Sequence, residues 1–412
     1  MTIKERIQLA ERNFSYLRQI GRDPGALEFE EIVTPTQAKL GGRNVTLFGT
    51  NNYLGLTFHQ GCVDAASFAI QKQGAGTTGS RMANGNYASH RNLEREIAQF
   101  HDKREAIVFS TGYLANVGMI SALAGAGDHL LIDADSHASI YDGCKMSDAQ
   151  TLRFQHNSPK SLARRLDHLA ESPGDKVVIV EGIYSMLGDR APLTEIAAIV
   201  RDAGEGVYLM IDEAHSLGCL GESGRGLCQE DDVEEDCDFI TGTFSKSIGT
   251  TGGYCTSDHE WFNGLRILSR PYIFTASMTP SAVETARAAF RIVSSAEGQA
   301  LKARLQRNYQ RVFEGVRALG FETGPQAGPV VALQLPDPET AIRVWNRVID
   351  EGLYTNIAIP PATPNGLSLL RVSISAAHSD EEIDEALATL ADIGVEFGLI
   401  GQPEKRAVGS RS

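Results

Sequence analysis

The sequence predicts an α/β protein, with a mostly parallel central sheet in a large domain and a smaller α+β domain toward the C-terminus. Short apolar runs alternate with segments of helical period from about residue 100 to residue 245, as in parallel sheets covered on both faces. The last hundred or so residues show a different order of strands and helices. The chain has 412 residues, 42% of them hydrophobic and 22% charged, which is typical of a globular protein with two or three structural units.

The expected strands of the large domain are rich in β-branched residues and apolar on both faces. Strands have this pattern when helices cover both sides of a parallel sheet. Just before the first strand, Leu93, Ile97 and Phe100 recur at helical spacing and predict an amphipathic helix. We expect the strands at residues 107–109, 130–132, 177–180, 207–211 and 239–241.

The C-terminal region has strands and helices of its own. A strand is expected at residues 330–335, followed by a helix through Ile342 and Val348. A proline-rich loop at residues 359–364 separates this helix from a second strand at residues 367–375. This order predicts a smaller α+β domain.

Two capping-box patterns mark expected helix starts. Ser379 and Glu382 open the final helix, and Ser281 with Glu284 opens a helix that links the two domains. We therefore expect an N-terminal arm or small-domain segment at residues 1–50, the large domain at 51–290, the C-terminal domain at 291–400 and a loose polar tail at 401–412.

The charge balance and the cysteines disfavour several classes of protein. The net charge of −14 repels phosphate backbones, so no nucleic-acid partner is expected. The N-terminus is charged from Lys4 onward and lacks the apolar core of a signal peptide, and the longest uncharged stretch, 109–127, is too polar for a membrane span. The six cysteines form no C-x-x-C pair, which favours reduced thiols in a cytosol.

Two motifs resemble known binding sites but lack the necessary context. The run Gly74-Ala-Gly76-Thr-Thr-Gly79 matches the dinucleotide fingerprint G-x-G-x-x-G, but it follows an expected helix at residues 63–73 and not a strand. Asp212 and His215 have no further ligands at a recognisable metal-binding spacing, so no metal is expected.

Polar residues at the ends of the expected strands are the candidates for chemistry, because open α/β sheets bind ligands there. Gly112 and Tyr113 follow the first strand and open a helix, which makes an anion site or a plain turn. Asp212 leaves a buried strand and needs a cationic partner. Lys246, in a pocket of small residues, is either a Schiff-base lysine or a solvated one, and His137 is either structural or catalytic.

Taken together these residues are more specific than any one of them. A phosphate cradle, a histidine that stacks on an aromatic ring, an acid for a ring nitrogen and a lysine for an aldehyde are the four needs of pyridoxal 5′-phosphate (PLP). Their order along the chain matches the large domain of fold-type I PLP-dependent transferases.

Over nearly its whole length the chain resembles the α-oxoamine synthases. The motifs that carry the resemblance are Asn51-Asn-Tyr-Leu-Gly55, Asp135-Ser-His137, Glu181-Gly-Ile-Tyr-Ser185, Asp212-Glu-Ala-His215, Thr243-Phe-Ser-Lys246 and Leu370-Arg371-Val-Ser373. The resemblance implies that Lys246 holds the cofactor and moves the Cα proton, and that His137 stacks on the ring. It implies cofactor contacts from Gly112, Tyr113, His137, Ser185, Asp212, His215, Thr243, Ser245, Lys246 and, from a neighbouring subunit, Thr275.

The resemblance also implies a substrate. Arg371 and Asn52 would bind the substrate carboxylate, whereas Ile359 stands where the related bacterial enzymes have an arginine. Ser80 leaves room for a hydroxymethyl group where glycine-specific members carry threonine. These features imply a homodimer with a shared active site, in the cytoplasm or peripheral to the inner membrane, that condenses L-serine with a long-chain acyl thioester of coenzyme A or of an acyl carrier protein.

Three alternatives remain open. Another family member could use glycine or alanine, as 8-amino-7-oxononanoate synthases and their relatives do. A partner subunit without catalytic activity has no need of Lys246, which is present. The family motifs disfavour an aminotransferase.

Overall fold

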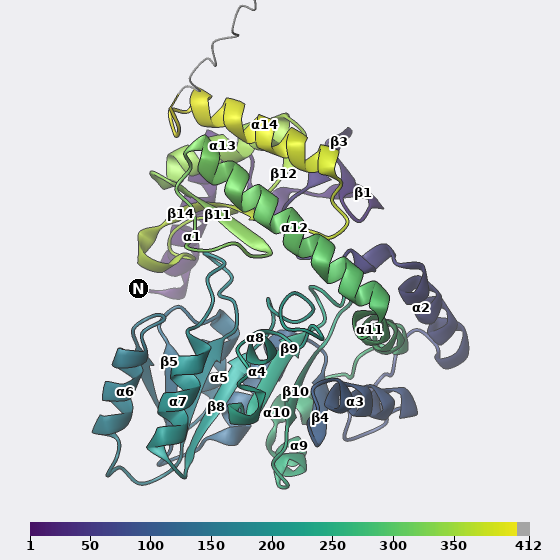
Figure 1. Cartoon of the computed structure of the whole chain (residues 1–412), viewed down its shortest axis with the longest axis vertical. Helices are drawn as coiled ribbons and strands as arrows, with labels where there is room; N and C mark the ends of the chain where they lie inside the picture. The colour runs from purple at the N-terminus through teal and green to yellow at the C-terminus, as the bar shows by residue number, and fades with distance from the viewer. Residues whose placement is uncertain (402–412) are drawn as a thin grey trace, which may run out of the picture.

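The protein is described from a computed structural model, which places residues 1–401. The polar tail expected from residue 401 onward lies, apart from Gly401, outside the described residues. The chain forms two bodies joined by the long helix α12 (Ala296–Leu319) (Figure 1). No helix in the described part of the chain is long and apolar enough to cross a membrane.

A seven-stranded sheet forms the centre of the larger body, in the order β4-β10-β9-β8-β7-β5-β6. Only β10 runs antiparallel to its neighbours, so the sheet is mostly parallel. The strands are β4 (Glu105–Phe109), β5 (His129–Asp133), β6 (Gln150–Phe154), β7 (Lys176–Glu181), β8 (Val207–Asp212), β9 (Phe239–Thr243) and β10 (Gly253–Ser257).

All five strands expected from the sequence are confirmed, and two further strands were not predicted. β6 lies at the edge of the sheet and includes three polar residues among its five, so it lacks the fully apolar run that indicates the other strands. β10 is buried but reads Gly-Tyr-Cys-Thr-Ser, which contains no aliphatic residue. Its antiparallel pairing with β4 and β9 depends on contacts between distant segments and not on local pattern.

Successive residues of the central strands pack on opposite faces of the sheet. Val178 and Leu209 belong to one hydrophobic cluster, and Ile179 and Met210 belong to another on the opposite face. Each cluster also contains side chains of the helices that cover that face. The helices of this body are α2 (Gln60–Gln73), α3 (Ala88–Phe100), α4 (Gly112–Leu123), α5 (Ala138–Met146), α6 (Pro159–His168), α7 (Leu193–Ala203), α8 (Leu227–Glu230), α9 (Leu265–Leu268), α10 (Arg270–Phe274) and α11 (Pro280–Val293).

The smaller body combines both ends of the chain. One sheet joins β1, β2 and β3 to β12, which runs parallel to β3, and a second sheet has the order β11-β14-β13. Helices α13 and α14 lie above these sheets (Figure 1). The elements are α1 (Ile3–Ile20), β1 (Phe29–Thr34), β2 (Gln37–Leu40), β3 (Arg43–Leu47), β11 (Val330–Leu335), α13 (Pro338–Asp350), β12 (Leu353–Tyr354), β13 (Asn356–Ala358), β14 (Ser368–Ser373) and α14 (Asp380–Glu396).

One predicted helix cap is confirmed and the other is wrong. Ser379 and Glu382 form a reciprocal capping box at the start of α14. At α11, however, the cap is Thr279, whose hydroxyl accepts the backbone N–H of Ala282 at 3.3 Å. Pro280 therefore occupies the first helical position, which suits a residue without an N–H, and Ser281 lies inside the helix.

Candidate active site

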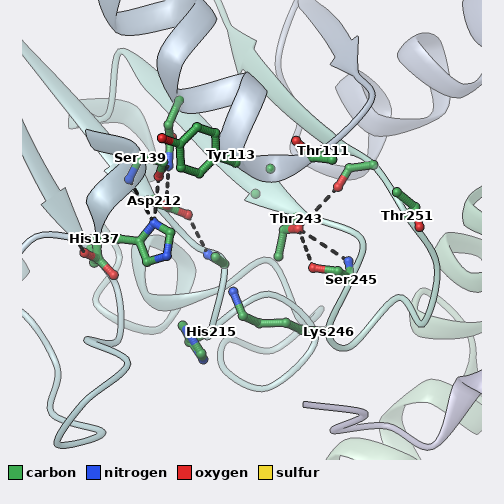
Figure 2. Close-up of a pocket in the computed structure, with 16 residues that line it drawn as sticks. Thr111, Tyr113, His137, Ser139, Asp212, His215, Thr243, Ser245, Lys246 and Thr251 are labelled. Atoms are coloured by element: carbon green, nitrogen blue, oxygen red, sulfur yellow. Dashed lines mark hydrogen bonds between the residues drawn. The ribbon is translucent and has the colours of Figure 1, made fainter. Parts of the chain in front are cut away.

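A cavity of about 250 Å³ opens at the carboxyl end of the central sheet. The last residues of β7, β8 and β9, which are Glu181, Asp212 and Thr243, all line it. Eight residues predicted from the sequence meet in this cavity: Gly112, Tyr113, His137, Asp212, His215, Thr243, Ser245 and Lys246. Figure 2 shows seven of these side chains around the same space.

One end of the cavity is suited to an anion. Helix α4 begins there, and the Thr111 hydroxyl caps it by accepting the N–H of Leu114 at 3.1 Å. The first backbone N–H groups of a helix have no intrahelical acceptor, and the helix dipole favours negative charge at this end. The hydroxyls of Thr243 and Ser245 lie 2.9 Å apart beside it. This end therefore has the donors that a phosphate group needs.

Two residues of this anion site act mainly through the backbone. A Cβ on Gly112 would lie 2.6 Å from the Cβ of Thr243, so only glycine allows the helix to start this close to β9. The Tyr113 hydroxyl donates to Asp142, and that hydrogen bond raises the pKa of Tyr113. Because the hydroxyl is bonded to Asp142, the group of Tyr113 that can donate to an anion is its backbone N–H.

The opposite end of the cavity is suited to a cationic ring nitrogen. The buried Asp212 carboxylate accepts the amide of Asn116 at 2.7 Å and the N–H of Ala214 at 2.9 Å. In the described part of the chain no basic side chain forms a salt bridge with Asp212. A buried carboxylate without a salt-bridge partner fits a protonated heterocycle, and this observation supports PLP as the bound group.

The Lys246 amine lies in the middle of the cavity, between His215 and Thr243 (Figure 2). Burial lowers the pKa of Lys246, against the opposing charges of Asp212 and Glu181. A lowered pKa increases the fraction of neutral amine, which is the form that attacks an aldehyde.

Two histidines flank this lysine. His137 caps α5, and its Nδ1 accepts the backbone N–H of Ser139 at 3.2 Å. The Nδ1 of His215 lies 2.7 Å from the hydroxyl of Tyr53. Burial lowers the pKa of both histidines, so both imidazoles are neutral near pH 7.

Two important cavity residues are not among the site residues that the sequence predicts. Asn116 hydrogen-bonds Asp212, and Glu181 accepts the backbone N–H of His137. Burial and the charge of Asp212 raise the pKa of Glu181 well above its usual range. A sequence signal existed for Asn116, because it is an isolated amide in an otherwise apolar part of α4.

The remaining predicted residues lie outside the cavity lining. Arg371 on β14 is largely buried, with Nε and one terminal nitrogen lacking a hydrogen-bond partner, and its charge helps to lower the pKa of Lys246. Asn52 donates to the Thr57 hydroxyl at 2.8 Å. Ser185 lies in the turn after β7, and Thr275 caps the C-terminus of α10 and donates to the Pro271 carbonyl at 2.5 Å.

Comparisons with known proteins show which proteins this chain is similar to. The family model "Aminotransferase class I and II" matches residues 43–390. A serine palmitoyltransferase of Caulobacter vibrioides is 51% identical over 395 residues, covering 96% of each chain. An 8-amino-7-oxononanoate synthase of Geobacter sulfurreducens is 37% identical, covering 87% of this chain and 91% of that one. A solved structure of SPT with PLP superposes with a TM-score of 0.94 at 42% identity, covering 97% of this chain and 100% of that one.

Proposed function

This chain belongs to the class I and II aminotransferase family, and within it to the α-oxoamine synthases, and we propose that it is a serine palmitoyltransferase. The reaction is the PLP-dependent decarboxylative condensation of L-serine with a long-chain acyl thioester to 3-ketosphinganine, the first step of sphingolipid synthesis. The observation that carries the proposal is one cavity containing the helix terminus at Gly112, the buried carboxylate of Asp212 and the amine of Lys246.

Different residues of the cavity would bind different parts of PLP. The N-terminus of α4, Thr243 and Ser245 would hold the phosphate, and Asp212 would hold the protonated ring nitrogen. When bound, PLP supplies an electron sink for negative charge that develops at the substrate Cα. Asp212 supports that chemistry because its charge keeps the ring nitrogen protonated.

Lys246 has two tasks in this assignment. Its amine would bind the cofactor aldehyde, and the same amine is the base that would take the proton from the serine Cα. A general base works best when its pKa is close to the working pH. Burial lowers the pKa of Lys246 and so brings it closer to neutral pH.

Arg371 is assigned to the serine carboxylate. Its unpaired guanidinium nitrogens, buried near Lys246, require an acidic partner, and a carboxylate can accept two hydrogen bonds from the guanidinium fork. Asn52 supports the same region indirectly, because its side-chain amide donates to the Thr57 hydroxyl and its backbone carbonyl accepts the Ser375 hydroxyl at 2.6 Å. Ile359 packs against the main hydrophobic core and offers no charge.

We further propose a homodimer in which Thr275 contributes to the site of the neighbouring subunit. The residues around Thr275 support this assembly, since Ile267, Leu268 and Phe274 are 65%, 60% and 71% exposed. Such apolar surface is typical of a subunit interface. We propose a cytoplasmic location, with contact at the inner membrane surface where a lipid product would be released.

The function is tested by turnover of the purified protein with a panel of amino acids and acyl thioesters. We expect L-serine to give faster thiol release than glycine or alanine, and a long acyl chain to be preferred over acetyl or succinyl. Parallel reactions with coenzyme A and acyl-carrier-protein thioesters identify the donor. Faster release with glycine or alanine at lower concentration would identify another α-oxoamine synthase, and no release with any pair would indicate a subunit without activity.

A further inference from the structure

Asn116 is the polar side chain among the buried residues of α4. The other buried residues of this helix are alanine, glycine, valine, methionine and isoleucine. Asn116 is only 3% exposed and lines the cavity. An amide in such a place must have hydrogen-bond partners, because an unpaired buried polar group is costly.

The partners of Asn116 determine which way its amide points. The carboxylate of Asp212 can only accept, so the nitrogen of Asn116 must face it, at 2.7 Å. The same nitrogen lies 3.0 Å from the hydroxyl oxygen of Ser139. On the other side, the amide oxygen accepts the hydroxyl of Thr241 at 3.0 Å. Both amide protons and the amide oxygen are thus used.

Ser139 continues the hydrogen bonds to His137. Its hydroxyl lies 2.8 Å from Nδ1 of His137, and its backbone N–H donates to the same atom at 3.2 Å. Since the backbone N–H can only donate, Nδ1 carries no proton, and the ring proton of the neutral imidazole is on Nε2. Burial, reinforced by Lys246 and opposed by Asp212, lowers the pKa of His137 and favours this neutral form. Figure 2 shows His137, Ser139 and Asp212 grouped on one side of the cavity.

We propose that Asn116 is a positioning residue that fixes Asp212 and His137 relative to one another, holding the carboxylate directly and the imidazole, as its Nε2–H tautomer, through Ser139. This inference rests on the proposed function, because these two groups are the ones assigned to the ring of PLP. The chain of hydrogen bonds runs from Thr241 through Asn116 to Ser139 and His137, and it connects β9, α4 and the start of α5.

The first test is made on the apoprotein, without cofactor or turnover. Histidine-selective ¹⁵N NMR of the wild type should show His137 protonated on Nε2 and unprotonated on Nδ1. The variant His137→Gln assigns its signal. A signal from the Nδ1–H form would overturn the proposal. This result is independent of the proposed function, which the turnover panel tests separately.

The second test is a double-mutant cycle on PLP affinity, measured by titrating PLP into apoprotein. We expect Asn116→Ala to raise the Kd at least tenfold and Ser139→Ala to raise it severalfold. The double variant should bind no more weakly than Asn116→Ala alone, because both changes break one connected path. The matched control is Ser121→Ala on the same helix, since its hydroxyl donates to the Val117 carbonyl of its own helix.

Three outcomes of this cycle would overturn the proposal. They are a Kd for Asn116→Ala within twofold of the wild type, strictly additive effects of the two changes, or an equal loss in Ser121→Ala. If Asn116→Ala does not fold, Thr241→Val leaves Asn116 in place but removes the donor to its oxygen. That variant should still raise the Kd severalfold, and an unchanged Kd would contradict the proposal.

Discussion

Replacing His156 with glutamine should destabilise the protein in a way that depends on pH. Nδ1 of His156 lies 2.8 Å from Asp133, and Nε2 lies 2.7 Å from Asp189. Burial disfavours the charged imidazole, but the hydrogen bonds and charges of the two carboxylates outweigh it and raise the pKa of His156 to about 10. The imidazolium joins the end of β5, just before His137, to the loop that follows β7. Glutamine keeps the hydrogen-bonding capacity and loses the charge.

The magnitude follows from the difference in pKa between the folded and unfolded protein. From an unfolded value of roughly 6.5 to a folded value of about 10, at roughly 1.4 kcal/mol per unit, the full linkage would be close to 5 kcal/mol. The side chain of His156 is 23% exposed, and solvent screens part of this interaction, so we expect about 2–4 kcal/mol. The stabilisation is complete below the unfolded pKa near 6.5 and is lost as the pH rises toward 10.

The assay is urea unfolding of His156→Gln and wild type at several pH values from 6 to 10. His168→Gln is the matched control, because His168 is an exposed histidine on α6. We expect His156→Gln to be less stable than the control at pH 6 and the difference to shrink at alkaline pH. Equal stability of the two variants at pH 6, or a difference that grows with pH, would refute the reasoning.

Four further predictions concern the cavity. Lys246→Ala should fold yet give no borohydride-trapped PLP adduct by peptide mass spectrometry, and a wild-type adduct on another lysine would contradict the assignment. Asp212→Asn should slow turnover roughly 10²-fold or more, because the ring nitrogen loses its counter-charge, so near-normal kcat would mean that another group has this role. Arg371→Ala should weaken serine binding by about 1.5–3 kcal/mol. Titration followed by the visible spectrum should then show a roughly ten- to 150-fold rise in the serine Kd, and an unchanged Kd would mean that Arg371 does not bind the substrate. Gly112→Ala should weaken PLP binding at least about tenfold, since a Cβ there lies 2.6 Å from a neighbouring threonine. The control Gly125→Ala should not weaken it, because a Cβ there has nothing within 4 Å. Equal affinities of the two variants would refute the steric reasoning.

The central sheet could be predicted from the sequence where its strands are buried on both faces. The run Val177–Val180 is apolar at every position because each face of β7 contacts a separate hydrophobic cluster. β10 shows the limit of this rule, since its burial comes from its place between β4 and β9 and not from an aliphatic run. The start of α11 shows another limit, because Thr279 and Ser281 both offer a capping hydroxyl and only the packed structure chooses between them.

The site could be predicted where function depends on single residues at strand ends. Asp212 is the last residue of the buried strand β8, and Lys246 lies in the turn that follows β9, so their position in the chain indicates the carboxyl edge of the sheet. Asn116 could not be assigned in this way, because its role depends on how α4 packs against the ends of β8 and β9. Asn52 belongs to a motif that the sequence shows, but the motif does not indicate that its side-chain amide donates to the Thr57 hydroxyl, as it does in the structure.

The most direct test of the proposed function is the fate of the serine carbons. The purified protein is incubated with uniformly ¹³C-labelled L-serine and a long-chain acyl thioester, and the lipid product and the released gas are analysed by mass spectrometry. We predict a 3-ketosphinganine that retains the labelled Cα and Cβ of serine, together with labelled CO₂ from the carboxyl group, and neither product from the Lys246→Ala variant. A product that keeps the serine carboxyl carbon, or the same products from Lys246→Ala, would contradict the account.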